Sequence, residues 1–73
     1  MKKMDLKYFL SEMENFKMSN SNYIIKPEDI QSAAEHAYLN YLDITAQGNT
    51  TEIAKLTATS SGFNFLLTKK SLI

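Results

Sequence analysis

The stretch PEDIQSAAEHAYLNYLDITAQG, residues 27–48, decides the fold of this chain. Pro27 suits the first turn of a helix, where its missing N–H has no partner in any case. Glu28 places negative charge at the positive end of the helix dipole. Gly48 adopts, without steric cost, the left-handed conformation that ends many helices. The stretch therefore predicts one helix that stops just before this glycine.

Apolar residues recur at helical spacing along this stretch and predict one buried face. They are Ile30, Ala34, Ala37, Tyr41 and Ile44. The small side chains in the first half allow another helix to approach closely. Leu39 lies on the opposite, polar face, and Tyr38 lies beside the buried face.

A second helix is predicted upstream, over residues 5–18. Its apolar residues, again at helical spacing, are Leu6, Phe9, Leu10, Met13 and Phe16. Asp5 is the expected N-cap. The polar segment SNSN at 19–22 ends the helix. Residues 23–25 are expected to be extended, because the residue before a proline is pushed away from helical geometry.

The last segment supports two interpretations. As a helix over residues 51–70, with Thr50 or Thr51 as its cap, it has two apolar faces. One face holds Ile53, Leu56, Phe63 and Leu67, and the other holds Ala54, Ala58, Phe65 and Leu72. We assign the first face to the bundle and the second to another molecule.

The competing interpretation is a β-hairpin over residues 53–68, with a turn at Ser60-Ser61-Gly62. The chain has no valine, and the first of the two strands alternates poorly, so helix is favoured. The predicted fold is an all-α three-helix bundle, with helices at about 5–18, 27–46 and 51–70, in one small domain spanning 1–73. The alternative is two helices plus the C-terminal hairpin.

Composition narrows the possible partners. A domain of 73 residues without cysteine has no disulfides to add to a small core, so we expect a homodimer or a bound protein partner. Eight lysines balance eight acidic residues, and arginine is absent, which disfavours nucleic acid as a partner. The sequence contains neither an apolar run of membrane-spanning length nor a signal-peptide pattern, so we expect a cytoplasmic protein that does not bind membranes.

The sequence contains no recognisable catalytic or cofactor-binding motif. His36 is the single histidine, and no cysteine is present to join it in a metal site. We therefore predict no enzyme activity, no cofactor and no metal. The expected function is a non-enzymatic protein–protein interaction module: a regulator, inhibitor or assembly factor, whose size and composition suggest a phage or mobile element. The interface candidates are Tyr8, Tyr38, Leu39, Phe65 and Leu72.

An alternative function comes from the segment TEIAKLTATSSGFNFLLTKK at 51–70, which resembles the helix-turn-helix of repressors. It has an Ile-Ala pair at its start and two serines where a recognition helix would begin. The motif normally has apolar residues where Thr59 and Asn64 stand. The resemblance implies a DNA-binding repressor or antitoxin. Its DNA-facing residues would be Ser60, Ser61, Asn64, Lys69 and Lys70.

Overall fold

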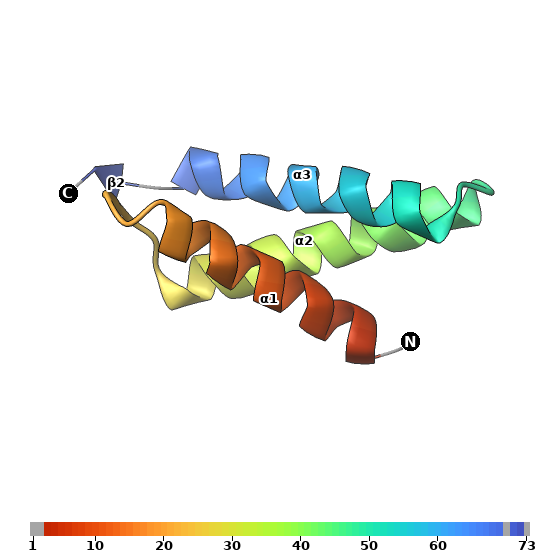
Figure 1. Ribbon diagram of the computed structural model, residues 1–73, viewed down its shortest axis with the longest axis horizontal. Coiled ribbons are helices and arrows are strands. Elements are labelled where there is room, and N and C mark those ends of the chain that lie inside the picture. Colours follow the sequence, from red (N-terminus) through yellow and green to blue (C-terminus); the bar gives the residue numbers. More distant parts are fainter. Residues whose placement is uncertain (1–2, 70, 73) are drawn as a thin grey trace.

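A computed structural model describes residues 3–69 and 71–72, with side chains for 5–69, and shows three packed helices (Figure 1). The helices are α1 (Lys3–Ser19), α2 (Pro27–Ala46) and α3 (Thr51–Lys69). The predicted all-α three-helix fold is confirmed. The hairpin alternative is wrong, because residues 51–69 form one uninterrupted helix.

Local signals set the helix boundaries. α2 begins at Pro27 as predicted, and Gly48, with φ of 93°, follows its end. At the start of α3, the backbone N–H of Ile53 donates to the Thr50 hydroxyl oxygen over 3.2 Å, so Thr50 is the cap. The expectation for Asp5 was wrong: α1 begins two residues earlier, and Asp5 lies in its first turn. There, its charge still complements the helix dipole.

α2 is the central helix. It runs antiparallel to both neighbours, packs most extensively against α3 and less so against α1, while α1 and α3 touch least. Phe9 and Met13 of α1 and Leu66 of α3 are the largest fully buried side chains. The Phe9 ring lies 5.6 Å from that of Tyr41 and 6.5 Å from that of Tyr38. This aromatic cluster joins α1 to α2.

Two short strands lie at the end of the bundle where α1 and α3 finish (Figure 1). β1 (Tyr23–Ile24) pairs antiparallel with β2 (Ser71–Leu72), so that Tyr23 faces Leu72 in the register. The extended segment expected before Pro27 is therefore present. Its pairing with the far end of the chain was not anticipated, since two residues are too few to show a periodic pattern.

A buried hydroxyl in the aromatic cluster gives a stability prediction. Tyr38 is 3% exposed, and its hydroxyl has no hydrogen-bond partner among the described residues. Tyr38→Phe is expected to raise the free energy of unfolding by about 1 kcal/mol, because the desolvation penalty of the unpaired hydroxyl disappears. Urea unfolding measures this change. Tyr41→Phe is the matched control and should bring no gain. A loss of about 1 kcal/mol at Tyr38 would instead show that an ordered water satisfies the hydroxyl.

Candidate interaction surface

The inner face of α3 is built from three small residues followed by one leucine. Ala54, Ala58, Gly62 and Leu66 follow one another at four-residue spacing and are all buried. A Cβ atom added at Gly62 would lie 2.6 Å from Cε of Met13 and 3.2 Å from Cβ of Ala37. Glycine allows this close approach without displacing the end of the Met13 side chain, so this face brings α3 near the alanines of α2.

The large apolar residues of α3 point outward instead. The exposed fraction is 52% for Ile53, 71% for Leu56 and 44% for Leu67. Phe63 is half-buried, and its ring stacks on that of Phe16 in α1 with centroids 4.9 Å apart. The sequence-based assignment of the two faces was therefore reversed: the face with alanines lies in the bundle, and the face with Ile53 and Leu56 is left over.

The physical reason for this reversal is the size of the side chains on the two faces. Ala33, Ala34 and Ala37 form a thin surface on α2, and a second thin surface fits against it with the helix axes close together. Bulky side chains between the two helices would hold them apart. The alanines at matching spacing on α2 and α3 could have indicated which face is buried. The prediction instead placed the other face in the bundle, because its hydrophobic area is larger.

We call the row on the outer side of α3 the outer stripe and define it as Ile53, Leu56, Ser60, Phe63 and Leu67. All of these residues are exposed except Phe63, which is half-buried. The positions alternate in steps of three and four, the spacing with which a helix packs against another helix. Ser60 at the centre is exposed and is the single polar residue of the row. The outer stripe thus has the form of a helix-packing surface.

The two borders of the outer stripe differ in charge. On the border away from α1, Thr57 and Asn64 are exposed and uncharged. On the side toward α1, Nζ of Lys55 lies 4.7 Å from the ring centroid of Tyr8. In this cation–π contact the charged group of Lys55 is held against a ring of the same molecule. Tyr8, an interface candidate from the sequence, thus lies exposed beside the first half of α3.

The other interface candidates are scattered. Tyr38 is buried in the aromatic cluster and is absent from the surface. Leu39 is 65% exposed, among the exposed polar residues of α2. Phe65 is half-buried, with its ring between His36 at 5.5 Å and Nζ of Lys69 at 5.7 Å. The side chain of Leu72 lies outside the described residues. The structure does not bring the five candidates together.

Four of the five residues expected to face DNA lie on one continuous helix, so residues 51–69 do not form a helix-turn-helix. Ser60, Asn64 and Lys69 are exposed, while Ser61 is half-buried. Lys70 lies outside the described residues. Ser60 and Ser61, where a recognition helix would begin, lie in the middle of α3. The packing of α3 against α2 along its length keeps this part of the chain helical.

A polar cluster links α2 and α3 beside the outer stripe. Nδ2 of Asn40 donates to the Ser61 hydroxyl oxygen over 2.6 Å and lies 3.3 Å from Nε2 of His36. A shallow groove of about 560 Å³ runs past this cluster. Its lining residues are His36, Thr57, Ser60, Ser61, Asn64, Phe65 and Thr68. Because Asn40 stands between histidine and serine, the cluster joins two helices and does not form a nucleophile–base pair.

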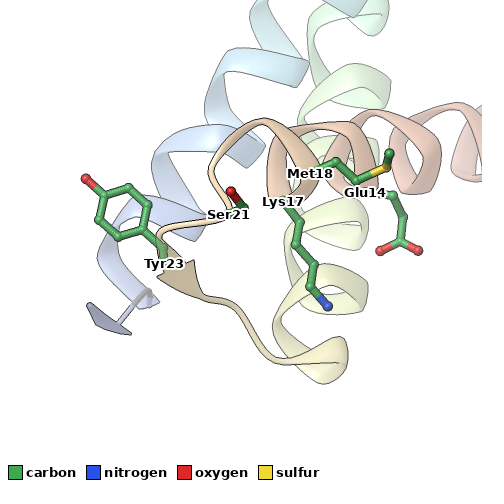
Figure 2. A pocket seen from close by; sticks show the side chains of 5 residues that line it. All are labelled: Glu14, Lys17, Met18, Ser21 and Tyr23. Carbon is green, nitrogen blue, oxygen red and sulfur yellow. The ribbon is translucent and has the colours of Figure 1, made fainter. Parts of the chain in front are cut away.

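A second hollow, of about 420 Å³, lies where α1 ends, and Figure 2 shows the side chains that line it. They are Glu14, Lys17, Met18, Ser21 and Tyr23. In Figure 2 the charged and aromatic side chains spread outward and do not converge on a common point. The hollow therefore lacks the convergent polar groups that fix a small ligand.

Within residues 3–69 and 71–72, no group of three or more histidine, aspartate or glutamate side chains is arranged to hold a metal ion. In the same part of the chain, no helix has the length and apolar character needed to cross a membrane. Comparison with protein-family models, curated proteins and solved structures found no match to this chain.

Proposed function

We propose that this protein is a small, non-enzymatic interaction module that binds another protein through the outer stripe of α3. The supporting observation is the row of Ile53, Leu56 and Leu67, exposed directly opposite the buried face of the same helix. Through this row the module would regulate or inhibit its partner, or act as a factor in its assembly. Interaction sites commonly take this form, a contiguous apolar patch bordered by polar residues.

The energetics support the same proposal. Full burial of a leucine or isoleucine side chain contributes about 1.5–3 kcal/mol. The exposed parts of Ile53, Leu56 and Leu67 amount to more than one and a half such side chains, and their burial contributes roughly 2–5 kcal/mol. A domain of this size has only a few kcal/mol of stability from its core, so a bound partner stabilises it substantially.

The test replaces the most exposed residue of the stripe by a charged one. Leu56→Glu is expected to abolish partner binding, because the carboxylate would have to lose its hydration in an apolar contact. Leu39→Glu is the matched control, a leucine on α2 that is 65% exposed, against 71% for Leu56. The wild-type protein and both variants are immobilised, and we measure which proteins each one captures in stoichiometric amounts. Free copies of the chain itself are among the proteins offered. Equal capture by all three proteins would contradict the proposal.

A further inference from the structure

We propose that His36, Asn40 and Ser61 form a proton-operated joint between α2 and α3, in which the Asn40 amide turns over when His36 takes up a proton. This inference goes beyond the proposed function and does not depend on it. Nδ2 of Asn40 lies 2.6 Å from the Ser61 hydroxyl oxygen and 3.3 Å from Nε2 of His36. The contacts thus connect a titratable side chain of α2 to a hydroxyl of α3.

In the neutral joint the amide is the donor on both sides. The amide nitrogen carries two hydrogens, of which one is donated to the Ser61 hydroxyl oxygen. The other can be donated to Nε2 of His36 only if this ring nitrogen carries no hydrogen itself. Because the hydrogen bond at one ring nitrogen fixes the tautomer, the neutral ring carries its hydrogen on Nδ1.

A proton from the solvent reverses this arrangement. Protonated imidazole donates from both ring nitrogens, so Nε2–H of His36 would face the N–H groups of Asn40, and two donors repel each other. A half-turn of the amide exchanges Nδ2 for Oδ1, which accepts a charge-assisted hydrogen bond from Nε2–H. The Ser61 hydroxyl rotates and donates to the same oxygen, since a hydroxyl can donate or accept. The two helices therefore remain joined in both states.

The position of the joint allows the amide to turn. His36 is exposed, and Asn40 and Ser61 are half-buried, so the turn takes place at the rim of the bundle and outside the core. The oxygen and nitrogen ends of an amide are nearly equal in size, so the turn leaves the packing of the helices unchanged. Asparagine is suited to this place because it offers both a donor and an acceptor. Aspartate offers acceptors alone when ionised.

The groove beside His36 is lined by α2 and α3, and charged groups lie near the ring on both helices. On α3, Nζ of Lys69 lies 5.7 Å from the ring centroid of Phe65, which lies 5.5 Å from that of His36. The acidic residues of α2 nearest to it in the sequence are Asp29, Glu35 and Asp43. Among the described residues, none of these carboxylates forms a hydrogen bond with His36. The oxygen of Asn40 is therefore the acceptor placed to receive the added hydrogen.

The turn changes what the groove of about 560 Å³ offers to a ligand. In the neutral joint the hydroxyl hydrogen of Ser61 is available to the groove or to a carbonyl of its own helix. In the protonated joint Asn40 holds that hydrogen, and the oxygen of Ser61 is left to accept. Protonation also places a second cation, beside Lys69, against the ring of Phe65. Acidification thus alters a surface that borders the outer stripe at Ser60.

Hydrogen exchange of the Asn40 side-chain amide, followed by nuclear magnetic resonance on the unmodified protein, tests the turn. The matched control is Asn64, an exposed amide that lines the same groove. At about pH 8 both hydrogens of Asn40 are bonded and should exchange at least about fivefold more slowly than those of Asn64, the factor that one typical hydrogen bond supplies. At about pH 5 neither is bonded, and the rates should agree within about twofold. Nitrogen shifts of the His36 ring should place its hydrogen on Nδ1 at the higher pH.

His36→Phe separates the effect of the proton from that of the ring. The variant keeps an aromatic ring beside Phe65 but takes up no proton, so the Asn40 hydrogen bonded to Ser61 should stay protected at both pH values. Loss of this protection at the lower pH would overturn the proposal. In the wild type, it would be overturned by a protected Asn40 hydrogen at the lower pH, by exchange as fast as that of Asn64 at the higher pH, or by a hydrogen on Nε2 there. The capture test with Leu56→Glu is independent of each of these outcomes.

Discussion

Replacement of Phe9 by alanine is expected to lower the free energy of unfolding by about 3–5 kcal/mol, the usual cost of removing a buried aromatic ring. Phe9 is fully buried, and its ring contacts those of Tyr38 and Tyr41 in α2. The core of a domain of this length supplies only about 3–5 kcal/mol of stability. The substitution therefore leaves a large fraction of the protein unfolded at physiological temperature.

Urea unfolding followed by circular dichroism measures this loss. Tyr8→Ala is the matched control, an aromatic ring one position earlier that is exposed and contacts the edge of Phe9. We expect its cost to be a small part of that at Phe9. Similar losses for the two variants would show that the aromatic cluster is not the main contact between α1 and α2.

The second large effect is expected at Gly62. Gly62→Leu should cost about 3 kcal/mol or more, because the side chain has no space between Met13 and Ala37 and must push α3 away from the bundle. Gly62→Ala should cost far less. There, the closest atom is the end of the flexible Met13 side chain, and alanine gains about 1 kcal/mol over glycine in a helix.

Thermal unfolding compares these variants with Ser60→Leu. This control adds the same side chain two residues away on the outer stripe, where Ser60 is exposed. Its thermal stability should stay close to that of the wild type. If Gly62→Leu and Ser60→Leu were equally stable, α3 would not pack through its small residues, and the outer stripe would not be the face left over.

Local signals in the sequence were sufficient to place the helices. Pro27 at the start of α2, Gly48 after its end and Thr50 before α3 act through one or two neighbouring residues, so no tertiary information is needed to recognise them. The same holds for the extended segment before Pro27. The boundaries of α1 and α3 are likewise within two residues of the expected positions.

Which face of α3 points inward was decided by the tertiary structure alone. Periodicity identified two apolar faces, but which one is buried depends on the surface that α2 offers. That surface is lined by Ala33 and Ala37, and it accepts Ala58 and Gly62 because thin faces allow the two helices to pack closely. The sequence by itself determined where the helices lie and that one apolar face of α3 would be left over. Only packing, a property of two surfaces together, determined that the exposed face carries Ile53, Leu56 and Leu67.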